Sequence, residues 1–213
     1  PIKVVGNAIN DSDVSCDSGP PFAGSKLKIA MPISRHYPWH GEDRLIRSAE
    51  RWVQENPQLE VEVYLIGVPG PRVTPHARLS VHKLPRLADG ALSSLLREMH
   101  LGASSLALHR KEMNDACPLK SRLFVAHRLP YLYGYRDPDI DESCRVALRV
   151  PNSDDLIDWH RVESFLRQAR VESNQREWEI LQHNLCGQTK ARNMAVFLSQ
   201  RYPHFSDGSQ ADW

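Results

Sequence analysis

The feature that most constrains the fold is an alternation of strand-like and helix-like segments that continues from residue 26 to residue 202. Short apolar or alternating runs predict strands, and apolar residues spaced three and four apart predict amphipathic helices between them. The predicted strands are 26–33, 59–66, 79–84, 103–108, 131–135 and 145–150. The predicted helices are 45–53 (opened by Gly41), 92–99, 118–128, 157–169, 175–185 and 190–202. This repeated alternation predicts an α/β fold, a parallel sheet with helices on both faces.

Composition places the chain among ordinary globular proteins and excludes several function classes. The 27 Lys and Arg residues against 26 Asp and Glu leave a net charge of +1, which argues against a protein that coats nucleic acid. The four cysteines form no CxxC pair, so a zinc ribbon or a disulfide framework is not expected, and a reducing compartment is. We find no apolar run of about 20 residues and no signal peptide. Because the chain starts at Pro1 and its first methionine is Met31, we expect a piece of a longer protein.

The topology also predicts where a ligand binds. In open parallel sheets, ligands bind outside the carboxyl ends of the strands. The segments that follow predicted strands are 34–40, 67–71, 85–90, 109–119 and 134–141. The glycines there match no dinucleotide fingerprint, no GxxxxGK[ST] loop and no GxSxG elbow.

The segment 109–120 carries the strongest signal. It leads into a predicted helix at Pro118, where free N–H groups and the helix dipole favour a phosphate. Lys120 and Arg110 could add positive charge, and Asp115 and Glu112 could accept hydrogen bonds from sugar hydroxyls. The alternative is that Asn114 or Asp115 merely caps the helix.

The segment 34–40 carries the second signal. Arg35 and His40 could clamp a diphosphate, since an arginine binds two oxygens at once. His36 and His40 are four apart, but Pro38 breaks the helix that would align them, so no metal pair is expected. The alternative is a solvated polar loop.

Three stretches of the sequence belong together: KVVGNAI (3–9), SRHYPWHGEDRLI (34–46) and LALHRKEMNDACPLKSRLFVAHRLPYLYGYRD (106–137). Together they resemble the C-terminal, donor-binding domain of a GT-B glycosyltransferase of the family 4 type. The first resembles the strand and turn at which the interdomain linker enters, and the second a strand–GR…KG–helix segment. The third resembles the acidic loop, helix and LP strand that bind the donor. The resemblance implies a Rossmann-like domain that binds a nucleotide sugar as substrate, with no cofactor and no protein-bound metal.

The resemblance also implies roles for particular residues. Arg35 and His40 would meet the diphosphate, Asp115 would hold sugar hydroxyls, and the base would lie near 83–86. The implied catalytic residues are Arg35, Asp115 and Lys120. The implied donor-binding residues are Ser34, Arg35, His40, Lys83, Asn114, Asp115, Ala116, Cys117, Pro118 and Leu119.

The sequence departs from the family pattern at three positions. His40 stands where lysine is usual, Asp115 is shorter than the usual glutamate, and Leu123 replaces the second acid, which usually holds the ribose. These departures leave room for a divergent or weakened member.

The resulting hypothesis is the donor-binding half of a glycosyltransferase that transfers a sugar to a glycan or lipid-linked acceptor in surface polysaccharide biosynthesis. Residues 1–25 would end the interdomain linker and enter the domain, 26–203 would bind the nucleotide sugar, and 204–213 would form a loose tail. Without its N-terminal GT-B domain the chain should be inactive. We expect the cytoplasm, with peripheral association at the inner face of the membrane left open. The alternatives are a degenerate non-catalytic binding module and a sugar-nucleotide epimerase.

Overall fold

The computed structural model describes residues 5–9, 14–15, 19–169 and 174–202. The strands are β1 (Lys26–Pro32), β2 (Glu60–Ile66), β3 (Val73–His76), β4 (Leu79–Leu84), β5 (Leu101–Ala103), β6 (Tyr131–Tyr133) and β7 (Ala147–Arg149). The α-helices are α1 (Glu42–Glu55), α2 (Asp89–Arg97), α3 (Leu119–Ala126), α4 (Trp159–Ala169), α5 (Gln175–Leu185) and α6 (Gly187–Arg201). Two short 3₁₀ helices are η2 (Pro38–His40) and η3 (Leu108–Lys111).

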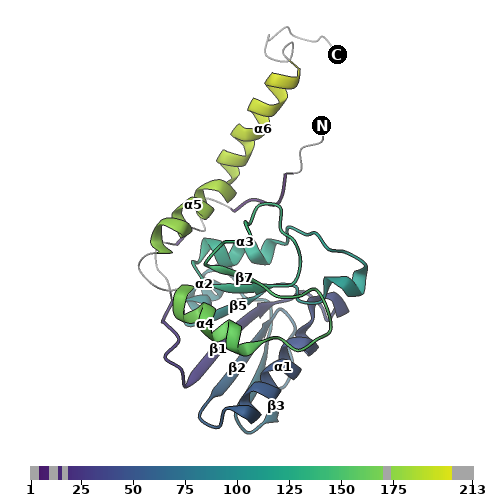
Figure 1. Ribbon diagram of the computed structural model, residues 1–213, viewed down its shortest axis with the longest axis vertical. Helices are drawn as coiled ribbons and strands as arrows, with labels where there is room; N and C mark the ends of the chain where they lie inside the picture. The colour runs from purple at the N-terminus through teal and green to yellow at the C-terminus, as the bar shows by residue number, and fades with distance from the viewer. Residues whose placement is uncertain (1–4, 10–13, 16–18, 170–173, 203–213) are drawn as a thin grey trace.

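The seven strands form one sheet in the order β3-β4-β2-β1-β5-β6-β7. Every neighbouring pair is parallel except β3 and β4. The central strands β1 and β2 pair over their full length, from Lys26 opposite Glu60 to Pro32 opposite Ile66. The predicted α/β fold, a mostly parallel sheet with flanking helices, is confirmed (Figure 1).

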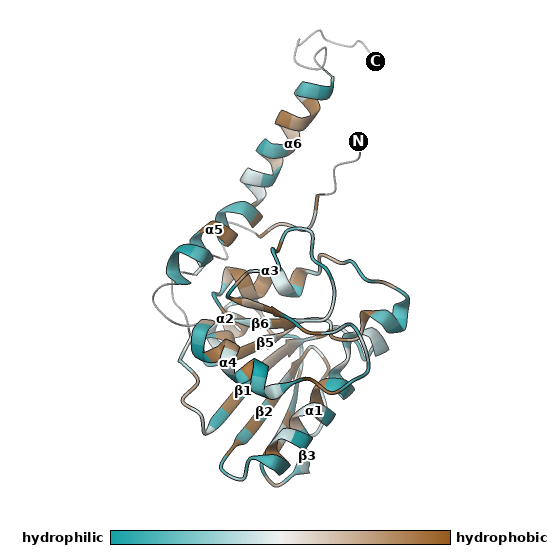
Figure 2. Cartoon of the chain, viewed as in Figure 1, coloured by the Kyte–Doolittle hydropathy of each residue, from teal (hydrophilic) through white to brown (hydrophobic). Residues whose placement is uncertain are grey.

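Hydrophobic cores fill both faces of the sheet. On one face, α1 and α4 pack against the sheet, and Trp52 stacks on Trp159 with ring centroids 4.7 Å apart. On the other face, α2, α3 and α5 cover a second core that includes Phe124 and Trp178. The sheet strands in this layered body are largely apolar, whereas the outer faces of the helices are largely polar (Figure 2). Burying both faces is the expected arrangement for a parallel sheet.

Several predicted boundaries are wrong for identifiable reasons. The predicted strand 103–108 is wrong, because β5 ends at Ala103 and a buried loop follows it. In that loop the Ser104 N–H donates to the Leu132 backbone oxygen, and the Leu106 N–H donates to the His40 backbone oxygen. Strand β3 was not predicted; its Pro75 is tolerated because β3 lies at the edge of the sheet.

The helix predicted at 190–202 begins earlier, at Gly187. The Cys186 side chain caps it by accepting a hydrogen bond from the Thr189 N–H. The predicted loose tail, and part of the predicted entry segment 3–9, lie outside the described residues.

Helix α6 extends away from the layered body (Figure 1). None of its described residues is buried, and the apolar side chains of Val196, Leu198 and Tyr202 at its end are exposed. Figure 2 shows hydrophobic positions, in brown, between hydrophilic ones along α6. No described helix is both long enough and apolar enough to cross a membrane.

Candidate functional site

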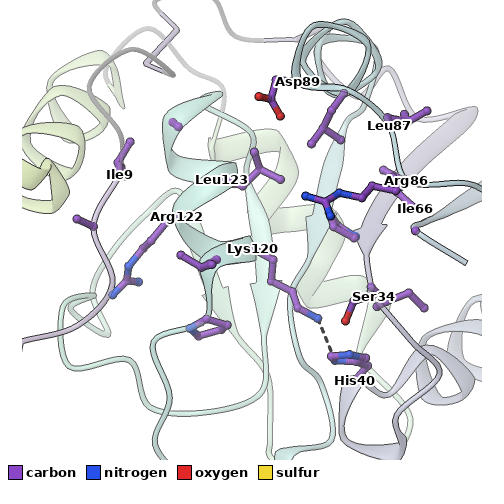
Figure 3. Close-up of a pocket in the computed structure, with 18 residues that line it drawn as sticks. Ile9, Ser34, His40, Ile66, Arg86, Leu87, Asp89, Lys120, Arg122 and Leu123 are labelled. Carbon is purple, nitrogen blue, oxygen red and sulfur yellow. Dashed lines mark hydrogen bonds between the residues drawn. The ribbon is translucent and has the colours of Figure 1, made fainter.

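A cavity of about 820 Å³ opens at the carboxyl edge of the parallel strands (Figure 3). Its walls come from the ends of β1 and β2, η2, the segment that leads from β4 into α2, the whole length of α3, and the entry segment. The lining residues are Ala8, Ile9, Pro32, Ile33, Ser34, His40, Ile66, Gly67, Arg86, Leu87, Asp89, Leu92, Pro118, Leu119, Lys120, Arg122, Leu123 and Ala126. The cavity therefore lies where the strand-end rule predicts a ligand.

Gly67 allows the ends of β1 and β2 to meet at the cavity. Its φ of 111° is a conformation that other residues rarely adopt. A Cβ atom at this position would lie 2.2 Å from the backbone oxygen of Ile33. Any side chain here would therefore push the two strand ends apart.

The amino terminus of α3 is uncapped by any side chain and faces the cavity. Pro118 occupies the N-cap position without a side-chain hydrogen bond, and Leu119 and Lys120 follow it in the cavity wall. The alternative expectation that Asn114 or Asp115 caps this helix is wrong. Asn114 instead accepts a hydrogen bond from Asn152 at 3.1 Å, and the Asp115 carboxylate binds Arg136. No described side chain thus caps the first N–H groups of α3, which leaves them available to an anion.

Lys120 and His40 form the polar centre of the cavity. Lys120 Nζ lies 3.1 Å from His40 Nδ1, which joins the first turn of α3 to the loop after β1 (Figure 3). Burial lowers the pKa of Lys120 to about 8, although the Glu42 carboxylate opposes this. Burial, helped by Lys120 and His36, lowers the pKa of His40 to about 4. At neutral pH, Lys120 is therefore mostly charged and His40 is neutral.

These charges fix the direction of the hydrogen bond. A protonated Lys120 can only donate, so His40 Nδ1 accepts and the proton of the neutral imidazole sits on Nε2. His40 Nε2 is buried and has no partner in the described structure. The pair thus presents one ammonium to the cavity, while the His40 Nε2–H is enclosed by protein.

The cavity brings together five of the eleven predicted site residues. Ser34, His40, Pro118, Leu119 and Lys120 line it. The others do not: Arg35, Lys83, Asn114, Asp115, Ala116 and Cys117.

The predicted site residues that do not line the cavity are exposed or bind other parts of the chain. Arg35 is exposed, and Asp115 forms an exposed ion pair with Arg136 that lowers the pKa of its carboxyl. The Cys117 backbone oxygen accepts a hydrogen bond from Asn7 at 2.5 Å.

Arg110 does not supply charge to the cavity, contrary to expectation. Its guanidinium holds Asp43 through two hydrogen bonds of 2.7 and 2.8 Å and also binds Asp154. The hydrogen bond to Asp43 raises the pKa of Arg110. The charged guanidinium therefore links η3 to α1 and does not reach the cavity. Glu112 is exposed at the end of η3 and does not line the cavity.

The structure adds lining residues that were not assigned roles from the sequence. Arg86 follows β4, within the segment expected to meet the base, and points into the cavity (Figure 3). Asp89 begins α2, and Leu87 and Leu92 flank it. In the sequence, the one sign that these residues could line a binding site is their position after a predicted strand.

Arg122 also reaches the cavity wall, but its charge is already balanced. The buried guanidinium pairs with Asp137 and Asp139 at 2.5 Å each and donates to the Asn7 oxygen at 2.9 Å. Lys190 of α6 binds Asp139 at 2.7 Å. The Cys117, Asp137 and Asp139 side chains lie close enough together to hold a metal ion, but these two cations already occupy the carboxylates.

The fold is that of one half of a GT-B glycosyltransferase. Three solved structures illustrate the match. A GtfA/B complex matches with a TM-score of 0.55 and 11% identity, covering 91% of this chain and 39% of that one. The α,α-trehalose 6-phosphate synthase of Burkholderia multivorans matches with a TM-score of 0.56 and 13% identity, covering 89% and 45%. S. aureus TarM, solved with UDP, matches with a TM-score of 0.51 and 12% identity, covering 86% and 37%.

This chain therefore spans less than half the length of each of these three structures. No protein-family model matches the sequence, and no curated protein does. Identities of 11–13% establish the shared fold and nothing further.

Proposed function

We propose that this domain binds a nucleoside diphosphate sugar in the 820 Å³ cavity and forms the donor-binding half of a glycosyltransferase. The observation that carries the proposal is the position of Lys120 and the uncapped start of α3 at the carboxyl edge of the sheet. A diphosphate there meets a mostly charged ammonium, the positive end of a helix and free N–H groups. The match to S. aureus TarM, a structure that contains UDP, supports this ligand class.

The same groups would contribute to sugar transfer. When the bond between the sugar and the diphosphate breaks, negative charge accumulates on the departing phosphate. Lys120 Nζ and the N–H groups at the start of α3 are placed before reaction begins, so they stabilise that charge without reorganising. We propose that Lys120 is the principal charged group, in place of His40.

The predicted roles of Arg35 and Asp115 require local rearrangement. Arg35 is exposed and adjoins Ser34, so a change of its side-chain rotamer would bring it to the cavity rim. Asp115 would have to exchange its partner Arg136 for a sugar hydroxyl. Because that ion pair is exposed, water screens it and the exchange costs little.

We further propose that a second domain completes the enzyme and supplies the acceptor side. The chain spans 37–45% of the three matched structures described above, and α6 leaves apolar side chains exposed at its end. The acceptor would be a glycan or lipid-linked acceptor in surface polysaccharide biosynthesis in the cytoplasm. The proposed domain boundaries remain 1–25, 26–203 and 204–213.

Isothermal titration with UDP-, GDP- and ADP-sugars tests donor binding. We expect one donor to bind and Lys120→Ala to weaken it about tenfold or more, since a hydrogen bond to a charged group contributes about 1.5–3 kcal/mol. The control is Lys26→Ala, which removes the same charge at the opposite end of β1, where Lys26 pairs with Glu62. No binding at millimolar donor, or equal losses in both variants, would contradict the proposal.

A second candidate is a non-catalytic module with the same fold. Leu123 in the cavity wall and the Asp115–Arg136 pair favour it, because neither offers a free carboxylate to the ligand. Joining the chain to its missing half and measuring donor hydrolysis separates the two. An enzyme shows at least slow hydrolysis, a binding module shows none, and an epimerase releases an altered nucleotide sugar without acceptor.

A further inference from the structure

A buried arginine of α1 binds backbone oxygens and no carboxylate. Arg44 is fully buried, yet it forms no ion pair with any described residue. Its Nη1 donates to the oxygens of Leu106 at 2.6 Å and Pro151 at 2.8 Å, and its Nε donates to the oxygen of Asp155 at 2.7 Å. Arginine keeps its charge in proteins, so enclosing it without a carboxylate costs free energy. What Arg44 contributes in return is the position of the two loops that carry these oxygens.

One of these loops supports η2, which contains His40. The Leu106 N–H donates to the His40 backbone oxygen at 2.9 Å, and the Ala107 N–H donates to the Trp39 oxygen at 3.4 Å. A Cβ atom at Gly41 would lie 3.1 Å from the Ala107 nitrogen, so the turn after His40 packs directly on this loop. The oxygen that Arg44 binds and the N–H that binds His40 therefore belong to the same residue.

His40 is in turn the partner of Lys120. Its Nδ1 lies 3.1 Å from Lys120 Nζ, at the polar centre of the cavity. The contacts thus continue from Arg44 through Leu106 and His40 to the ammonium group. Arg44 does not line the cavity itself, so any effect that it has on a ligand passes through these contacts.

Resting on the proposed function, which gives Lys120 the principal charge, we propose that Arg44 is a positioning residue for the His40–Lys120 pair. It holds the Leu106 loop against α1, and this loop fixes the backbone of η2 at His40. Without Arg44, the buried Leu106 oxygen loses its charged donor and η2 moves more freely. Lys120 then gains contact with water, and its ammonium group is held less firmly at the start of α3.

An NMR titration of the lysine side chains tests this in the whole chain without a ligand. In the natural sequence, burial lowers the pKa of Lys120 to about 8, and Glu42 is the charged neighbour that opposes this. Arg44→Lys keeps the positive charge but loses the planar fork, so the pKa of Lys120 should rise by about one pH unit or more toward its ordinary value. Arg44→Gln should give the same rise, because Arg44 is not among the charges that act on Lys120.

Ser48→Ala is the matched control. Ser48 is buried one turn after Arg44 in α1, and its hydroxyl accepts a hydrogen bond from the Ile157 N–H at 3.0 Å. The variant loses this bond and leaves Leu106 untouched, so it should lower the free energy of unfolding and leave the pKa of Lys120 unchanged. Equal rises of that pKa in Ser48→Ala and Arg44→Lys would report loosened packing in general and contradict a positioning role.

Titration with inorganic pyrophosphate at pH 7 connects the pair to the proposed function. Lys120 is mostly charged at this pH in every variant, so a loss of affinity reports its position. We expect affinity to fall about threefold or more in Arg44→Lys and to stay unchanged in Ser48→Ala.

The outcomes separate this inference from the proposed function. If neither pyrophosphate nor a nucleotide sugar binds the natural chain, the proposed function fails, and the pKa of Lys120 still decides the link to Arg44. An unchanged pKa of Lys120 in both Arg44 variants contradicts the inference alone. If neither variant folds, the natural chain decides: saturating pyrophosphate should slow exchange of the Arg44 Nε–H about threefold or more, because coupling between two sites is reciprocal. An unchanged exchange rate would contradict the link.

Discussion

At the scale of the residue, Lys120 is the group on which the proposed chemistry depends. It is half-buried, and the Glu42 carboxylate only partly offsets the effect of that burial on its ammonium group. Its His40 partner is neutral at physiological pH, so the ammonium is not repelled by a second positive charge. A single charge of this kind suits a single diphosphate.

Donor affinity should fall as the pH rises through about 8. The pKa of Lys120 is lowered to about 8 by burial, so the ammonium is charged below that pH and lost above it. Titrating a nucleotide sugar, whose phosphates do not ionise further in this range, should give about tenfold weaker binding at pH 9 than at pH 7. His40, with a pKa of about 4, adds no change above pH 6. Lys120→Ala should abolish this pH dependence; a pH dependence that survives in the variant would assign it to another group.

The buried Arg122 should matter far more to stability than the exposed Arg136. Arg122→Met leaves the buried Asp137 carboxylate without its cation, which should cost about 3–5 kcal/mol of unfolding free energy. Arg136→Met breaks an ion pair whose partners are both exposed, and should change stability little. Urea denaturation of the two variants provides the comparison. Equal losses of unfolding free energy in the two variants would mean that burial does not increase the contribution of the Arg122–Asp137 ion pair.

At the scale of the element, the position of α3 is set by a close approach to β5. A Cβ atom at Gly102 would lie 2.7 Å from the Phe124 ring, and Phe124 is buried in the core beneath α3. The helix can therefore lie close to the sheet only because residue 102 is a glycine.

Gly102→Ala should destabilise the protein by about 1–3 kcal/mol, because the core must move to admit the methyl group. Gly90→Ala in α2 is the matched control, since nothing lies within 4 Å of the Cβ it would carry. Alanine also favours a helix more than glycine does, so no loss of stability is expected there. Thermal unfolding measures both. A destabilised Gly90→Ala variant together with an unaffected Gly102→Ala variant would contradict the packing described for β5 and α3.

Ligand binding should protect the start of α3 from hydrogen exchange. The amides of Leu119 and Lys120 lie in the first turn, where no intrahelical carbonyl accepts from them. With saturating donor their exchange should slow at least tenfold, whereas amides in the middle of α1 should not change. Mass spectrometry of the exchanged chain measures this. Unchanged exchange at Leu119 and Lys120 would place the phosphate elsewhere.

The elements could be predicted where burial leaves a regular pattern. In β1 and β2, buried residues alternate with less buried ones over much of each strand, and their predicted boundaries were accurate to within a residue. The strand predicted at 103–108 was wrong because small apolar residues also suit a buried loop whose N–H groups reach neighbouring segments. Strand β3 depends on its pairing with β4, which a local pattern containing Pro75 does not reveal.

The site was predictable in place but not in detail. The strand-end rule selected the loops around Ser34, His40 and Lys120, all of which line the cavity. The spacing of residues within 109–117 did not show that Arg110 is held by Asp43 or that Asp115 pairs with Arg136. Those partners are 67 and 21 residues away along the chain, so only the folded structure shows them.

At the scale of the whole molecule, the chain has the fold of one half of a two-domain architecture. It spans less than half of each of the three structures compared above, and α6 projects from the layered body with no described residue buried (Figure 1). Lys190 near the start of α6 pairs with Asp139, which also binds Arg122 of the cavity wall. The base of the projecting helix is thereby fixed to the proposed donor site.

The central claim, that the cavity at the start of α3 holds a diphosphate, is tested most directly by a crystal structure of the chain with a saturating nucleoside diphosphate sugar. The account predicts phosphate oxygens within hydrogen-bond distance of Lys120 Nζ and of the first N–H groups of α3. A ligand bound instead beside Asp115 and Arg136, or a cavity that stays empty at saturation, would contradict it.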